Sequence, residues 1–181
     1  ENEIAQSEIV FGKKPWVNYW MHGEFLEIKG GKMSKSHGKT KTISQLEEEG
    51  INPLAYKYFT YTANYRKPLT WSEESLNTSI NSFKRLKNLT LKLKKEETEN
   101  KEYLKKFEER INNDLDMPGA LAILWKLLRD EKAKGKFETI KKMDEVFGLD
   151  LLEKEKIKIP EEIVILAEDR KKLRKDKNWK G

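Results

Sequence analysis

Apolar residues recur every three or four positions over most of the chain after residue 42. The clearest run lies between residues 72 and 93 and contains six of them: Leu76, Ile80, Phe83, Leu86, Leu89 and Leu93. Residues at this spacing share one face of a helix, so the run predicts a single long amphipathic helix. The four residues Thr70 to Glu73 fit a capping box, which places the start of the helix there.

Shorter helices are predicted on both sides of the long one. A short helix is expected to stop at Gly50, and Asn52 with Pro53 is typical of the N-cap and first residue of another that runs towards Ala63. Later helices are predicted around four apolar groups: Leu104, Phe107 and Ile111; Leu121, Leu124, Trp125 and Leu128; Ile140, Met143 and Phe147; and Ile163, Leu166 and Leu173 after Pro160. Residues 150–160 are the expected linker before the last of these helices.

The first 41 residues differ from the rest, because only they have strand character. Apolar and polar residues alternate from Val17 to Met21, and a second apolar group runs from Phe25 to Ile28. We expect two short strands or a hairpin that leads into a loop at Gly30-Gly31. The alternation assigns three aromatic residues to the core or wall of this part rather than to base stacking: Trp16, Tyr19 and Trp20. The sequence therefore predicts a mainly α protein with a small α/β part at its start.

Composition narrows the class of protein. The chain has 181 residues, with 37 Lys and Arg against 31 Asp and Glu, and its net charge is +6. No apolar run approaches the roughly 20 residues of a membrane span, and Glu1-Asn2-Glu3 is not the basic start of a signal peptide. Without cysteine, the chain alone builds neither a disulfide framework nor a Cys-based metal site. We expect a cytoplasmic protein with a polyanionic partner and no membrane association, and the absence of an initiating Met indicates a piece of a longer protein.

A strongly basic loop is the first candidate for chemistry. Residues 29–41 carry five basic residues and no acidic one: Lys29, Lys32, Lys35, Lys39 and Lys41. Glycines let such a loop bend, and its serine hydroxyls bond phosphate oxygens, so it suits a phosphate-binding site. A solvated basic hairpin tip fits this composition equally well.

The order of residues within the loop favours the phosphate-binding interpretation. Lys32 to Ser36 read KMSKS, which resembles the second signature motif of class I aminoacyl-tRNA synthetases. In that family the loop closes over ATP while the carboxylate of an amino acid attacks the α-phosphate. The resemblance implies that Lys35, and after it Lys32, are the catalytic lysines. It also implies that Met33 anchors the ATP-binding loop and that Ser34 and Ser36 shape it.

Phrases on both sides of the motif are similar to cysteinyl-tRNA synthetases in particular. They lie at six places along nearly the whole chain: Glu1–Ser7, Trp16–His22, Tyr65-Arg66, Trp71–Glu74, Asn113–Ala122 and Arg170–Trp179. The likeness implies three parts: the end of a Rossmann-type α/β catalytic domain with the KMSKS loop over residues 1–41, a helical stem-contact region over 42–98, and a helical anticodon-side bundle over 99–181. The nucleotide-binding half that precedes these parts in the family is expected to lie outside this chain.

The resemblance also implies an activity. The family uses ATP, with Mg, to convert cysteine to cysteinyl-adenylate, and then transfers the cysteinyl group to tRNA(Cys). Family members bind Zn²⁺ through two Cys, one His and one Glu, and Glu3 corresponds to that Glu. Because the other three ligands are not in this chain, we expect zinc in the complete enzyme only. We also expect the chain alone to be a monomer and to be inactive.

Two basic stretches are candidates for contact with tRNA. Residues 84–95 hold six basic residues and no acid, and residues 170–180 hold seven against a single Asp. Both stretches are assigned to helices, and the predicted tRNA-binding residues are Lys84, Arg85, Lys87, Arg170, Lys171 and Arg174. Phosphate contacts of this kind make RNA binding depend on salt. Solvated helix faces in a lysine-rich protein fit these stretches equally well.

Two other functions remain open at this point. One is a cysteine ligase of the same fold that passes the aminoacyl group to an amino sugar. The other is a noncatalytic helical module that binds tRNA, in which the loop lysines only contact phosphates.

Overall fold

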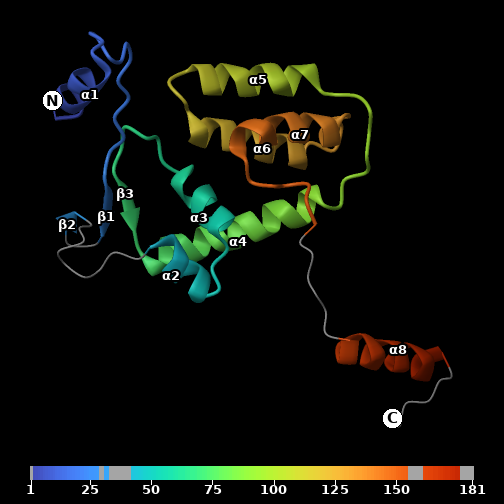
Figure 1. Cartoon of the computed structure of the whole chain (residues 1–181). Coiled ribbons are helices and arrows are strands. Elements are labelled where there is room, and N and C mark those ends of the chain that lie inside the picture. Colours follow the sequence, from blue (N-terminus) through green and yellow to red (C-terminus); the bar gives the residue numbers. More distant parts are fainter. Residues whose placement is uncertain (1, 29–30, 33–41, 155–160, 176–181) are drawn as a thin grey trace.

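The computed structural model of the chain describes residues 2–28, 31–32, 42–154 and 161–175 (Figure 1). In chain order the elements are α1 (Asn2–Phe11), β1 (Leu26–Ile28), β2 (Gly31–Lys32), α2 (Ile43–Glu48), α3 (Pro53–Thr60), β3 (Leu69–Trp71), α4 (Glu73–Thr90), α5 (Lys101–Asn112), α6 (Met117–Arg129), α7 (Lys136–Phe147) and α8 (Glu161–Lys175). The predicted mainly helical character is confirmed. No helix among the described residues is both long enough and apolar enough to cross a membrane.

The long amphipathic helix is confirmed as α4, but its cap lies elsewhere than predicted. Ser72 is the N-cap: its hydroxyl accepts a hydrogen bond from the backbone N–H of Ser75 at 3.0 Å, and the Ser75 hydroxyl accepts one from the Ser72 N–H at 3.0 Å. The predicted box from Thr70 to Glu73 was wrong, because Thr70 lies in β3 and pairs with Glu27 of β1. The backbone therefore stays extended up to Trp71 before the helix starts.

The helices before and after α4 follow the predicted signals. The side chain of Asn52 accepts a hydrogen bond from the Leu54 N–H at 2.8 Å, and Pro53 occupies the first turn of α3, as predicted. Helix α3 ends at Thr60, three residues before the predicted end at Ala63, because Tyr61 is the C-cap. Helix α7 ends at Phe147, and its C-cap Gly148 has a left-handed backbone with φ 56°.

One hydrophobic core runs through α3 to α7. Helix α3 packs along α4, and α5 packs along α6, with α7 against both of the latter. In Figure 1 these helices form stacked layers, with α5 outermost and α4 on the opposite side. The buried cluster contains Ala55, Tyr58, Phe83, Leu86, Tyr103, Phe107, Ala120, Leu121, Leu124, Leu127, Ile140, Met143, Phe147, Leu149 and Leu151. Burial of this apolar surface is the main source of stability for these helices.

Two hydrogen bonds join the C-terminal end of α7 to the C-terminal part of α3. The Lys57 ammonium donates to the Gly148 carbonyl at 2.9 Å, and the Tyr61 hydroxyl donates to the Phe147 carbonyl at 2.9 Å. The last carbonyls of a helix have no partner within the helix, so these side chains satisfy groups that would otherwise need water. The positive charge of Lys57 also meets the negative end of the α7 dipole.

The N-terminal part departs most from the prediction. The predicted strand from Phe25 to Ile28 forms as β1, but its antiparallel partner is β2, which includes Gly31 of the predicted loop. Strand β1 also pairs in parallel with β3, giving the strand order β2-β1-β3. The predicted strand from Val17 to Met21 is wrong, because these residues form no sheet pairing among the described residues. Tyr19 is 93% exposed and Trp20 is 46% exposed, so their placement in a core was wrong for this chain. Helix α1 was not predicted.

Helix α8 was correctly predicted to start near Pro160. It begins at Glu161 and is set apart from the other helices in Figure 1. Residues 155–160 of the predicted linker lie outside the described residues.

We expect Tyr61→Phe to lower the free energy of unfolding of the chain by about 1 kcal/mol, because it removes the hydrogen bond to the Phe147 carbonyl and keeps the ring. Urea unfolding followed by circular dichroism measures this change. Tyr56→Phe is the matched control, because the Tyr56 hydroxyl makes no hydrogen bond with a described residue. Equal effects of the two substitutions would contradict the capping role of Tyr61.

Candidate nucleic-acid interface

The predicted ATP-binding motif begins at the last residue of the β1–β2 hairpin. Lys32 ends β2, where its backbone pairs with Glu27 of β1. Met33, Ser34, Lys35 and Ser36 lie outside the described residues, so their roles remain predictions. The motif thus begins in the second strand of a hairpin, whereas the sequence placed Gly31 and Lys32 in a loop.

This hairpin is held against the helices by Trp71. Trp71 pairs with Ile28 at the end of β3. Its ring lies 5.9 Å from the ring of Tyr56 and 5.9 Å, edge to face, from the ring of Phe59. Aromatic pairs at this distance and tilt are favourable. The strands that precede the motif are therefore anchored on α3 and lead directly into α4.

A second connection, through Asp114, joins the segment before β1 to the helices. The Asp114 carboxylate accepts hydrogen bonds from the Tyr65 hydroxyl at 2.6 Å, from Arg66 Nε at 2.6 Å and from Arg66 Nη2 at 3.1 Å. The Tyr65 carbonyl in turn accepts from the Glu24 N–H at 2.7 Å. Asp114 lies between α5 and α6 with a left-handed backbone, φ 55°. The segment that leads to β1 is thereby connected to the turn between two helices of the bundle.

These hydrogen bonds stabilise the charged form of Asp114. The Arg66 guanidinium is the largest cause, and the Tyr65 hydroxyl the next, of a fall in the pKa of Asp114 from 3.8 to about 2. Hydrogen bonding to the Asp114 carboxylate also raises the pKa of Tyr65 and the pKa of Arg66. Asp114 was not singled out from the sequence; its only signal was its place in the phrase Asn113–Ala122.

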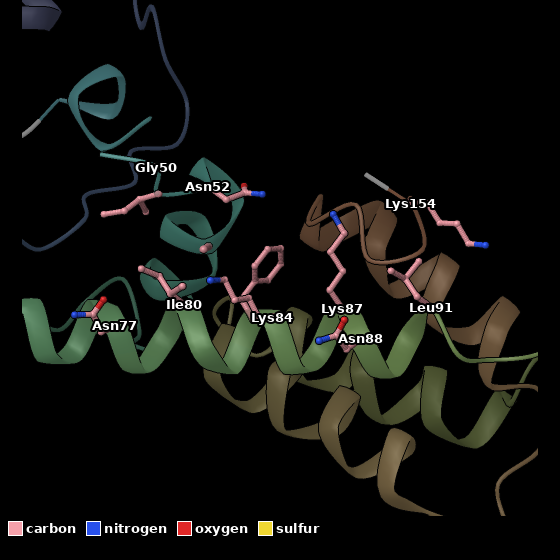
Figure 2. Close-up of a pocket in the computed structure, with 12 residues that line it drawn as sticks. Gly50, Asn52, Asn77, Ile80, Lys84, Lys87, Asn88, Leu91 and Lys154 are labelled. Carbon is pink, nitrogen blue, oxygen red and sulfur yellow. The ribbon is translucent and has the colours of Figure 1, made fainter. Parts of the chain in front are cut away.

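A hollow of about 860 Å³ opens between the start of α3, one face of α4 and the segment that follows α7 (Figure 2). Helix α4 contributes residues three and four positions apart, and the other two segments close the hollow from above in that view. The lining residues are Gly50, Ile51, Asn52, Ala55, Asn77, Ile80, Phe83, Lys84, Lys87, Asn88, Leu91 and Lys154.

The structure brings two of the predicted tRNA-binding residues together in this hollow. Lys84 is exposed, whereas Lys87 is only 9% exposed, and Lys154 joins them from the opposite side. Arg85 does not line the hollow, and its guanidinium lies 6.0 Å from the ring of Trp125. No acidic residue is found among the described residues that line the hollow, so its electrostatic character favours anions.

The other three predicted tRNA-binding residues lie elsewhere. Arg170, Lys171 and Arg174 are exposed on α8, away from α4 in Figure 1. The two basic groups therefore do not form one surface in this arrangement. The first basic stretch, residues 84–95, also extends beyond the observed helix, since α4 ends at Thr90.

The donor set for a zinc ion is incomplete in the described part of the chain. Glu3 is exposed in the first turn of α1. No group of three or more His, Asp or Glu side chains in the described residues is arranged to hold a metal ion. His22 stacks on Trp20 instead, with ring centroids 6.1 Å apart. These residues do not fit a zinc site by themselves, and the role of Glu3 as one ligand in a longer protein remains a prediction.

Comparisons with known proteins find cysteine–tRNA ligases that match nearly the whole chain. A family model described as the tRNA synthetases class I (C) catalytic domain matches residues 1–81. A cysteine–tRNA ligase of Prochlorococcus marinus is 35% identical over 224 residues, which cover 99% of this chain and 45% of the relative. Cysteine–tRNA ligase 1 of Burkholderia lata is 35% identical over 98% of this chain and 38% of the relative. A cysteine–tRNA ligase of Chlamydia felis is 33% identical over 99% of this chain and 42% of the relative. The chain spans less than half the length of these relatives.

We expect the stabilising effect of Asp114 to disappear in acid. Because folding lowers the pKa of Asp114, its contribution is present above the unfolded pKa of about 4 and is lost as the pH falls through the folded value of about 2. Asp114→Asn should therefore be less stable than the parent chain at pH 7, and the difference should shrink between pH 4 and pH 2. Urea unfolding across this pH range measures it.

Asp150→Asn is the matched control for this series. Asp150 also has a left-handed backbone, with φ 51°, and its carboxylate makes no hydrogen bond or ion pair with a described residue. Asn tolerates this backbone as well as Asp does, so neither substitution adds strain. A difference between Asp114→Asn and the parent that stays constant with pH would contradict the assignment.

Proposed function

Because the chain belongs to the cysteinyl-tRNA synthetase family, we propose that the full-length protein activates cysteine with ATP and transfers the cysteinyl group to tRNA(Cys). One observation carries the proposal: Lys32 to Ser36 spell KMSKS in a chain that matches cysteine–tRNA ligases over 99% of its length. The motif begins at Lys32, the last residue of β2, in the small sheet whose Trp71 packs on Phe59 of α3.

In the first step the carboxylate oxygen of cysteine attacks the α-phosphorus of ATP, and pyrophosphate leaves. Negative charge grows on the leaving phosphates, so a lysine that contacts them most strongly in the transition state lowers the barrier. We assign this role to Lys35, supported by Lys32. Met33 anchors the ATP-binding loop, and the hydroxyls of Ser34 and Ser36 shape it. Magnesium enters with ATP as part of the substrate.

In the second step the cysteinyl group moves from the adenylate to the terminal ribose of tRNA(Cys), with AMP leaving. The helical part of the chain would hold the tRNA for this transfer. The cationic hollow beside α4 and the exposed basic residues of α8 support this assignment, because phosphate contacts supply most of the affinity of proteins for RNA. Zinc would bind the thiol of cysteine in the complete enzyme, with Glu3 among its ligands.

Lys35→Ala tests the first step in the full-length protein. We expect cysteine-dependent exchange of pyrophosphate into ATP to fall by about two orders of magnitude or more, because the substitution removes one charge from the transition state. Lys13→Ala is the control, because Lys13 is an exposed lysine of the same N-terminal part. Near-normal exchange with Lys35→Ala would contradict the catalytic role and favour a noncatalytic RNA-binding module.

The basic face of α8 gives a separate prediction. We expect the double variant Lys171→Ala with Arg174→Ala to reduce the slope of log affinity for tRNA(Cys) against log salt by about 2, since each lost phosphate contact lowers it by about 0.9. Filter binding at several salt concentrations measures the slope. Lys171→Arg with Arg174→Lys keeps both charges and should keep the slope. An unchanged slope in the alanine variant would remove α8 from the tRNA-binding surface.

A further inference from the structure

We propose that the hollow beside α4 takes a single unpaired nucleotide of the bound RNA. The proposal rests on the proposed function for the identity of the RNA and adds which part of it enters the protein. A volume of about 860 Å³ falls in the range of roughly 300–1,000 Å³ that is typical of sites for small molecules. The bases of an RNA duplex stay paired and stacked, whereas an unpaired base can be splayed out and enter a concave site.

The lining of the hollow divides into an apolar floor and a polar rim. Ile51, Ile80 and Leu91 are half-buried side chains around the fully buried Phe83, and they offer a surface for the face of a base. Apolar and stacking contacts of this kind accept any base, because every base has an apolar face.

The rim carries hydrogen-bonding groups that are available to a ligand. Asn77, Lys84 and Asn88 lie along the same side of α4, and none of them has a hydrogen bond or an ion pair with a described residue. Figure 2 shows their side chains beside the hollow, with Lys154 at its other end. A lysine ammonium binds a phosphate oxygen as a point charge, whereas an asparagine amide both donates to and accepts from the edge of a base. The combination matches a nucleotide better than an isolated phosphate.

The walls of the hollow are held in place before any ligand binds. Phe83 is 2% exposed and Leu86 is completely buried, so the α4 wall is fixed by the core. The opposite wall is tied to α4 by the Thr90 hydroxyl, which donates to the Leu151 carbonyl at 2.5 Å. A preformed site avoids part of the entropy cost of ordering its side chains on binding.

The experiment measures binding of short RNA to the full-length protein by fluorescence anisotropy. Three probes of equal length carry the same number of phosphates per strand: a single-stranded octaribonucleotide, its abasic counterpart that lacks every base, and the matching duplex. We expect the single strand to bind about tenfold more tightly than the abasic strand and than the duplex, because only its bases fill the hollow.

Two variants assign this preference to the hollow. Asn88→Leu should weaken binding of the single strand by about fivefold to tenfold and bring it close to the abasic value. Lys84→Gln removes a phosphate contact, so it should weaken binding of the single strand and of the abasic strand by the same factor. Asn112→Leu and Lys105→Gln are the matched controls on α5, where both residues are exposed and outside the hollow. The controls should leave the preference for bases unchanged.

Three results would overturn the proposal. Equal binding of the single strand and the abasic strand would reduce the hollow to a phosphate contact. Competition by AMP alone as strong as that by the octanucleotide would make it a site for a free nucleotide. A preference for bases that survives Asn88→Leu would place the base elsewhere. Cysteine-dependent pyrophosphate exchange is measured in parallel to distinguish this proposal from the proposed function. If the proposed function is wrong, the parent protein shows no exchange. If only the nucleotide site is wrong, the parent protein still shows exchange.

Discussion

The arrangement of the chain depends on how the C-terminal end of α7 is bonded to the helices that precede it in the sequence. Lys57 of α3 donates to the carbonyl of Gly148, the C-cap of α7, and Tyr61, the C-cap of α3, donates to the carbonyl of Phe147. Thr90 at the end of α4 donates to the carbonyl of Leu151, which follows α7. The Asp144 carboxylate accepts from the N–H groups of Leu149 and Leu151, which turns the chain back towards α4. Carbonyls that a helix cannot satisfy internally are thus used to join parts of the chain that are about ninety residues apart.

The two candidate sites follow from this constraint in different ways. The hollow exists because the segment after α7 is held above α4 instead of continuing away from it. The motif at Lys32 to Ser36 is connected to the same helices through β1, β3 and Trp71, which contacts Tyr56 and Phe59. Helices α3 and α4 therefore connect the strands that precede the proposed ATP-binding motif with the surface proposed for RNA. The proposed reaction would use ATP and tRNA in successive steps, which needs the two binding regions fixed relative to each other.

The sequence predicted the elements whose signals are local. The apolar period of α4 and the Asn52-Pro53 start of α3 act within a few residues, and the structure confirms them. The errors lie where distant pairing decides the outcome. Residues 69–71 are extended because they pair with β1, which moved the helix cap to Ser72, and the alternating segment from Val17 to Met21 has no pairing in the described part of the chain.

The same distinction between local signals and distant contacts applies to the candidate sites. Lys84 and Lys87 were found from a run of charge, and the motif from the order of its residues. Asn77, Asn88 and Lys154 join Lys84 only through tertiary structure, and Asp114 owes its lowered pKa to Arg66, forty-eight residues earlier. Residues 33–36 lie outside the described residues, so their catalytic assignment remains a prediction.

The central claim is the reaction, and the most direct measurement is the fate of radiolabelled cysteine given to the full-length protein with ATP and Mg²⁺. In parallel reactions the acceptor is tRNA(Cys) or an amino sugar. The account predicts cysteine attached to the tRNA by a bond labile to mild base, with release of AMP and pyrophosphate. Transfer to the amino sugar alone, or no use of cysteine with either acceptor, would contradict it.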